Sequence, residues 1–262
     1  MTVVQTHTII GQTAARGLVG ILLPIARQPV YYNRFVSDAL SNLAEGGKRA
    51  AVAVGAPAVV AGPPSYLPAA GSATGIVTPA SMAGDCTLLV AARKPAQATG
   101  GFHVAPLISN YYTDASGKWQ GILFGHDTYD QTQDLPVLWA VESETGSSNQ
   151  MGGDLITTAQ GQAWNLHSVR LTGVGQKGYT AIISNHTTGT TKTITSDNTI
   201  PLLPATPNFA VGTTFIASNG GLVDHADILC AGIFDTALSD DDLQAVVDIE
   251  RRWQSSINGV TL

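Results

Sequence analysis

Glu142 and Glu144 are the residues of this sequence that come closest to a catalytic pair. They follow the strand-like segment 136–141, and alternate residues of a strand point to the same side, about 6.5–7 Å apart. Glycosidases use two carboxylates at about this separation, one as general acid and one as nucleophile or base. The pair leaves two interpretations open: a polysaccharide-degrading glycosidase, or two solvated acids at the end of a strand.

Six further residues have the composition of a sugar-binding surface. Aromatic rings contact the apolar C–H faces of sugars, while carboxylate and imidazole groups beside them form hydrogen bonds with the hydroxyls. The candidate glycan-binding residues are Tyr111, Tyr112, Asp114, Trp119, His126 and Asp127. In the alternative interpretation, Trp119 belongs to the core, and Tyr111 and Tyr112 cover one end of the domain.

Asp224 and Asp227 offer oxygen ligands for a Ca²⁺ ion. Calcium takes about six to eight oxygen ligands, and a single Asp-x-x-Asp pair falls short of that number. We therefore expect a capping role for Asp224 and a strand beginning at Asp227, with a calcium site as the alternative. The sequence contains neither a phosphate-binding loop nor a dinucleotide-binding glycine motif, so we expect no cofactor.

The two cysteines, Cys86 and Cys230, both lie inside apolar, strand-like segments. Neither belongs to a Cys-x-x-Cys motif or has a histidine at metal-ligand spacing. We expect both to be free and buried, because a free cysteine behaves as a small apolar side chain.

The elements that must position these residues are mostly short strands. From residue 51 onward, β-prone runs alternate with Gly, Pro, Asn and Ser, as is typical of an antiparallel sandwich or jelly roll. The predicted strands are 51–54, 58–61, 75–78, 86–92, 121–124, 136–141, 166–172, 179–184, 192–195, 208–211 and 226–234. The glycine-rich segment 173–178 and the segment 186–191 are predicted hairpin tips.

Two helices are predicted, one near each end of the chain. Ser239 is an N-cap followed by three aspartates, and Leu243, Val246, Val247 and Trp253 fall on one face of the helix that it begins. Near the other end, apolar residues at helical spacing predict a helix over 33–45, ended by two glycines. We expect residues 1–50 to form an arm with this helix that serves attachment or oligomerisation. The alternative is that the arm wraps around the main domain.

The composition excludes several classes of protein. The chain has 262 residues, a net charge of −6 and only 12% charged residues, with 44% hydrophobic residues. A chain this apolar is not intrinsically disordered, and its acidic balance argues against nucleic-acid binding. The most apolar segment, 17–26, has about half the length that a membrane span requires. Because it is also a poor signal peptide, we expect synthesis in the cytoplasm without one.

Several segments together resemble the concanavalin A-like, laminin-G-like jelly-roll superfamily. The segment 228–247 is similar to the closing segment of that superfamily, with a strand, an Asp-x-Ala-Leu-Ser turn and an acidic helix start. Three earlier segments also resemble family segments and occur in the family's order: 83–95, 164–171 and 209–212. The resemblance covers about residues 51–255. It implies a jelly-roll domain over 51–262 with two antiparallel sheets and a C-terminal helix. It also implies carbohydrate or protein binding.

The amino-acid composition of the chain, which is rich in Ala, Gly and Thr and low in charge, also resembles that of bacteriophage virion proteins. The resulting expectation is a non-enzymatic virion protein of the tail-appendage, receptor-binding type that binds a bacterial surface glycan. We expect it to form a homo-oligomer, with a trimer as one option, and to contact other virion proteins through residues 1–50. The alternatives are a capsid decoration protein and a glycosidase that uses Glu142 and Glu144.

Overall fold

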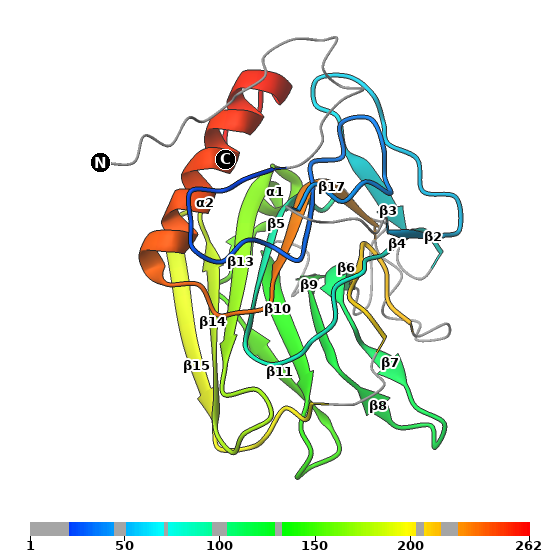
Figure 1. Ribbon diagram of the computed structural model, residues 1–262, viewed down its shortest axis with the longest axis vertical. Helices are drawn as coiled ribbons and strands as arrows, with labels where there is room; N and C mark the ends of the chain where they lie inside the picture. Colours follow the sequence, from blue (N-terminus) through cyan, green and yellow to red (C-terminus); the bar gives the residue numbers. More distant parts are fainter. Residues whose placement is uncertain are drawn as a thin grey trace.

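The computed structural model describes residues 21–44, 51–70, 73–95, 104–128, 133–202, 207–215 and 225–262. Within these residues, a seven-stranded and an eight-stranded antiparallel sheet pack face to face, and a two-stranded hairpin extends from the lower end of the molecule (Figure 1). This architecture confirms the predicted all-β, two-sheet sandwich.

The strands of each sheet come from widely separated parts of the chain. The seven-stranded sheet contains β1 (Tyr31–Asn33), β3 (Leu67–Ala70), β5 (Cys86–Arg93), β13 (Asn165–Thr172), β14 (Tyr179–Asn185), β15 (Thr190–Ser196) and β17 (His225–Phe234). The eight-stranded sheet contains β2 (Val52–Val54), β4 (Gly75–Val77), β6 (Val104–Ser109), β9 (Ile122–Thr128), β10 (Gln133–Val141), β11 (Ser148–Gly152), β12 (Ile156–Thr157) and β16 (Ala210–Val211). The hairpin consists of β7 (Tyr112–Thr113) and β8 (Trp119–Gln120).

The helical elements are α1 (Thr158–Gln162), α2 (Asp240–Trp253) and a single π-helical turn (Gln254–Asn258) that continues from α2. Among the described residues, no helix is long and apolar enough to cross a membrane.

Strand β5 shows how the sequence builds two layers of core. Leu88 and Val90 point into the space between the sheets, whereas Leu89 and Ala91 belong to a second apolar cluster on the other face. Because successive side chains of a strand alternate between faces, a strand buried on both sides must be apolar throughout. The continuous apolar run of β5 is therefore typical of a central strand covered from both directions.

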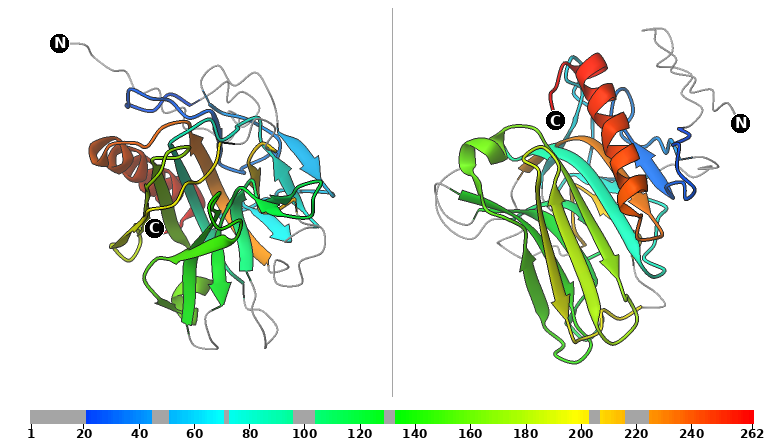
Figure 2. Two further views of the ribbon diagram at one scale, coloured as in Figure 1. Left: turned by 90° about the horizontal axis from the view of Figure 1, so that it is seen from below. Right: turned by 90° about the vertical axis from the view of Figure 1, so that its left-hand side faces the viewer.

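Helix α2 provides the cover on the outer face of the seven-stranded sheet (Figure 2). Its N-terminus is capped as predicted, because the Ser239 hydroxyl accepts a hydrogen bond from the backbone N–H of Asp242 at 3.1 Å. Leu243, Val246 and Val247 are buried against the second apolar cluster. The sequence thus predicts where this helix begins and three of the apolar residues that it buries, whereas Trp253, predicted on the same face, is only partly buried.

Most of the predicted strands are present. The described structure forms no strand over 58–61, where Val60 makes only an isolated bridge with Tyr66. Strand β6 and the short strands β1, β3, β7, β8, β11 and β12 were not predicted. Both cysteines are buried and free, as predicted.

The helix predicted over 33–45 does not form in the described residues 33–44. Phe35 has a φ of +43°, in the left-handed region that an α-helix cannot include. The Asn33 side chain accepts a hydrogen bond from the N–H of Phe35 and donates to the carbonyls of Asp38 and Ala39. Such side-chain bonds replace the backbone bonds of a helix.

The segment 21–44 instead packs onto its own sandwich. Strand β1 pairs with β17, and the rings of Tyr31 and Phe35 lie in the core between the sheets. Arg34 forms an ion pair with Glu250 of α2 at 2.6 Å. The described residues 21–44 therefore lie against the sandwich of their own chain.

Candidate functional site

The predicted glycan-binding residues Tyr112, Asp114 and Trp119 lie on the β7–β8 hairpin. The Asp114 carboxylate accepts hydrogen bonds from Ser116, Lys118 and Gln120 within the turn. These bonds, first that from the Ser116 side chain, lower the pKa of Asp114 to about 2. Trp119 is 43% exposed and is therefore not a core residue. The hairpin thus presents one tryptophan, while its aspartate holds the turn together.

Tyr111 lies behind this hairpin and is fully buried. Its ring centroid is 6.1 Å from that of Trp119 and 6.5 Å from that of Trp139 on β10, and its hydroxyl donates to Ser148 at 3.2 Å. Tyr111 therefore supports the exposed ring of Trp119 and is not itself presented to a ligand.

His126 and Asp127 are neighbours on β9 and point to opposite faces of the eight-stranded sheet. Asp127 is buried and accepts a hydrogen bond from Gln150 at 3.2 Å. His126 points between the sheets, where its Nε2 lies 2.8 Å from Nε2 of His167 on β13. The six predicted residues consequently do not converge on one site.

The carboxylates of Glu142 and Glu144 are both occupied by hydrogen bonds within the protein. The two residues lie in the turn after β10, not on the strand from which their separation was predicted. Glu144 accepts from the backbone N–H and the hydroxyl of Thr199, and the Thr199 side chain is the largest cause that lowers the pKa of Glu144 to about 2.

Glu142 is 3% exposed, and burial raises its pKa. Hydrogen bonds outweigh this effect and hold the pKa below its ordinary value. The donors are Tyr179, Ser196, Asn149 and Asn198. A glycosidase needs one carboxyl group with a raised pKa as its general acid. The surroundings of Glu142 and Glu144 instead lower the pKa of both carboxyl groups. The hydrogen bonds of Glu142 connect the β10–β11 turn to β14 and β15.

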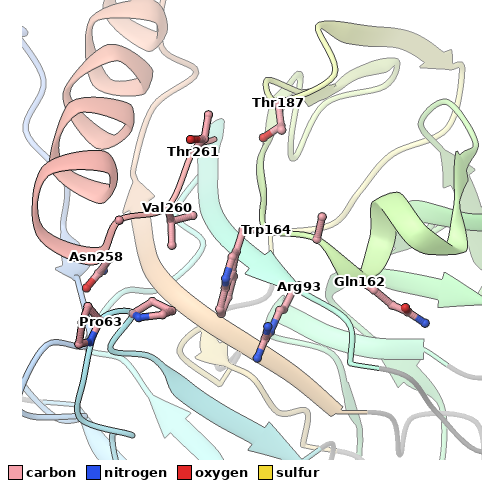
Figure 3. Close-up of a pocket in the computed structure, with 11 residues that line it drawn as sticks. Pro63, Arg93, Gln162, Trp164, Thr187, Asn258, Val260 and Thr261 are labelled. Carbon is pink, nitrogen blue, oxygen red and sulfur yellow. The ribbon is translucent and has the colours of Figure 1, made fainter.

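A pocket of about 680 Å³ lies at the end of the sandwich where β5 ends and β13 begins (Figure 3). Five separate segments line it: the loop before β3, the end of β5, the α1–β13 junction, the loop after β14, and the tail after α2. The lining residues are Pro63, Pro64, Arg93, Gln162, Ala163, Trp164, Thr187, Asn258, Gly259, Val260 and Thr261. The pocket is shallow and open to solvent over much of its extent.

Among the described residues that line the pocket, Arg93 is the one that carries a charge, and contacts on several sides fix its position. Its guanidinium carbon lies 4.5 Å from the ring centroid of Trp164 and 5.6 Å from that of Tyr66. Its Nε donates to Asp227 Oδ2 at 2.8 Å. A guanidinium held between aromatic rings and a carboxylate loses little further freedom when it binds a ligand.

Amide and hydroxyl groups complete the lining of the pocket. Asn258 is held by two hydrogen bonds, because its carbonyl accepts from the N–H of Ser65 and its amide donates to Gln254. The Thr187 hydroxyl accepts from the N–H of Leu166, which leaves its own proton to donate. Gln162 is exposed at the edge of the pocket (Figure 3).

Sequence reasoning did not select this pocket. In the sequence, Trp164 and Arg93 lie within two of the segments that resemble the jelly-roll superfamily, 164–171 and 83–95, and neither segment carries a motif that indicates a binding site. Asp227 was considered as a calcium ligand, but it pairs with a guanidinium, and Asp224 lies outside the described residues. Among the residues that the structure describes, no three His, Cys, Asp or Glu side chains are grouped to hold a metal ion.

Comparisons with known proteins identify the fold. No protein family and no curated protein matches the sequence. The binding domain of botulinum neurotoxin serotype D matches over 85% of this chain and 52% of its own, with a TM-score of 0.54 and 9% identity. A Trypanosoma rangeli sialidase in complex with 2,3-difluorosialic acid matches over 91% of this chain and 34% of its own, with a TM-score of 0.54 and 12% identity.

The chain therefore spans about half of the neurotoxin binding domain and about a third of the sialidase. At these identities the likeness concerns the fold alone, which is a two-sheet β-sandwich.

Proposed function

We propose that this protein is a carbohydrate-binding module and that the Arg93–Trp164 pocket is its binding site. The observation that carries the proposal is the pocket's lining, in which an aromatic ring and a fixed guanidinium adjoin amide and hydroxyl groups. Sugars need this combination, because their C–H faces are apolar and their hydroxyls require directed hydrogen-bond partners.

The proposed module binds without catalysis. Glu142 and Glu144 hold no raised-pKa carboxyl group that could serve as the general acid of a glycosidase. Their hydrogen bonds instead give both a structural role in the turn after β10.

Replacing Trp164 by alanine is expected to weaken glycan binding at least tenfold, because it removes the aromatic wall of the pocket. The matched control is Trp119→Ala, which removes an exposed tryptophan from the β7–β8 hairpin, outside the pocket. A glycan array would first identify a bound oligosaccharide, and titration calorimetry with that oligosaccharide would compare the variants.

If Trp119→Ala abolishes binding and Trp164→Ala leaves it unchanged, the binding site is the hairpin surface and not the pocket. If no oligosaccharide on an array of bacterial and animal glycans binds, the proposed function itself is wrong.

We also propose that the module belongs to a bacteriophage particle, as a receptor-binding tail appendage that works as a homo-oligomer. The support is the composition of the sandwich: residues 156–222 contain only four charged residues, and exposed β15 is rich in threonine. Residues 21–44 are packed onto the sandwich, and their outward-facing surface belongs to the region 1–50 through which we propose contacts with other virion proteins.

Mass spectrometry of purified particles is expected to detect the protein at a copy number similar to that of tail proteins. A copy number equal to that of the major capsid protein would support the decoration-protein alternative. Absence from the particle would contradict both virion roles.

A further inference from the structure

We propose that the Arg93–Trp164 pocket selects sugars that carry a carboxylate, with Arg93 as the group that recognises it. This inference rests on the proposed glycan-binding function and names the ligand class of the same site. The shared chemistry is that of a sugar acid, which hexuronic acids and sialic acids both supply.

The first step of the argument concerns which edges of the guanidinium are occupied. The Nε of Arg93 donates to Asp227. Among the described residues, no hydrogen bond joins either terminal Nη nitrogen of Arg93 to another protein group. The side chain is 34% exposed, and it lines the pocket beside Trp164 (Figure 3). The terminal edge of the guanidinium is thus available to a ligand.

The second step concerns geometry. Two parallel N–H groups of a guanidinium match the two oxygens of a carboxylate, and such bidentate bonds are about twice as strong as those between neutral groups. Trp164 and Tyr66 flank the guanidinium, and Asp227 fixes its other edge. The fork is therefore oriented before the ligand arrives, which reduces the conformational entropy lost on binding.

The third step concerns charge. Asp227 compensates the charge of Arg93 at 2.8 Å, so the pocket has no large excess of positive charge. Recognition of an acidic sugar would then depend on directed hydrogen bonds from the terminal nitrogens of Arg93 rather than on general electrostatic attraction. A lysine at this position would retain the positive charge and the ion pair with Asp227, but it lacks the two parallel N–H groups that bind both oxygens of a carboxylate.

The test compares matched pairs of oligosaccharides in titration calorimetry. One set ends in a hexuronic acid and a second set in a sialic acid, and each is paired with its carboxyl-reduced counterpart. The wild-type protein is expected to bind the acidic member of at least one pair at least tenfold more tightly. The two sets distinguish the two sources of the carboxylate.

Two variants isolate the role of Arg93. Arg93→Lys is expected to lose most of the preference for the acidic member while retaining binding of the reduced one. The double variant Arg93→Gln with Asp227→Asn removes both charges together, so that no unpaired charge is left at the site, and it is expected to lose the preference entirely. Lys192→Gln, on exposed β15, removes a positive charge elsewhere and is expected to change nothing. The thermal midpoint of each variant checks its folding.

Equal binding of the acidic and reduced members by the wild type would overturn the inference and leave the proposed function intact. Persistence of the preference in a folded double variant would overturn it as well. If neither member of any pair binds, the proposed function fails, and this inference fails with it.

Discussion

Replacing Glu250 by alanine is expected to lower the free energy of unfolding by about 3–5 kcal/mol, the usual cost of removing one partner of a buried ion pair. Both Nε and Nη2 of Arg34 donate to Glu250 Oε1, at 2.9 and 2.6 Å. Both side chains are buried, and the guanidinium lies 4.1 Å from the ring centroid of Trp253. Without Glu250 the Arg34 charge would remain in the interior with no carboxylate to compensate it.

Urea denaturation would measure this loss, with Asp248→Ala as the matched control. Asp248 is a half-exposed acid on the same helix, whose carboxylate accepts a hydrogen bond from Gln244. Its contact with Arg251 at 4.0 Å is a surface pair worth less than about 1 kcal/mol. The double variant Arg34→Met with Glu250→Leu removes both charges and is expected to recover much of the stability. If Glu250→Ala costs no more than Asp248→Ala, the ion pair does not hold segment 21–44 to α2.

The contrast between α2 and residues 33–44 shows which parts of the fold can be predicted from sequence. The signals for α2 are local: an N-cap, acids in the first turn and one apolar face, all of which the structure retains. Residues 33–44 show similar apolar spacing, but there the decisive contacts are long-range. Arg34 meets a carboxylate 216 positions away, and β1 pairs with β17. The spacing of apolar residues within the segment 33–44 cannot indicate these contacts, because the contacting residues lie far away in the sequence.

The same distinction explains why the sequence indicated the β7–β8 aromatic residues but not the pocket. Tyr111, Tyr112 and Trp119 are close in sequence, so their clustering is visible along the chain. Arg93 and Trp164 are 71 positions apart (164 − 93) and meet because β5 and β13 are paired antiparallel, with Asn165 opposite Ala92. The register of β5 and β13 places Arg93 beside Trp164. Residues 258–261, which follow α2, form another wall of the pocket.

Acidification below about pH 6.5 is expected to destabilise the protein through its buried histidine pair. Burial, followed by the charge of Lys94, lowers the pKa of His126 to about 3. Burial and the neighbouring His126 and His186 lower the pKa of His167 well below its ordinary value. In the folded protein both rings stay neutral, with one Nε2 donating to the other at 2.8 Å.

The direction follows from proton uptake. Below about pH 6.5 the unfolded chain binds protons on these imidazoles and the folded protein does not, so the free energy of unfolding falls as the pH falls. The stability is fully present above pH 6.5. The loss is up to about 1.4 kcal/mol per pH unit for each ring and continues until the folded protein itself takes up protons. His186, whose pKa is lowered to about 4 chiefly by burial and then by Arg251 and Arg170, adds to the loss in the same range.

Urea denaturation at pH 7.5, 6.5, 5.5 and 4.5 would measure this dependence. The double variant His126→Leu with His167→Leu replaces both polar rings by apolar groups and is expected to show a clearly smaller slope between pH 6.5 and 4.5. His225→Gln, which changes an exposed histidine, is expected to keep the wild-type slope. The lowered pKa values of Glu142 and Glu144 act in the same direction, but only below about pH 4.5, because that is where their unfolded forms take up protons. An unchanged slope in the folded double variant would show that the buried pair is not the source of the acid sensitivity.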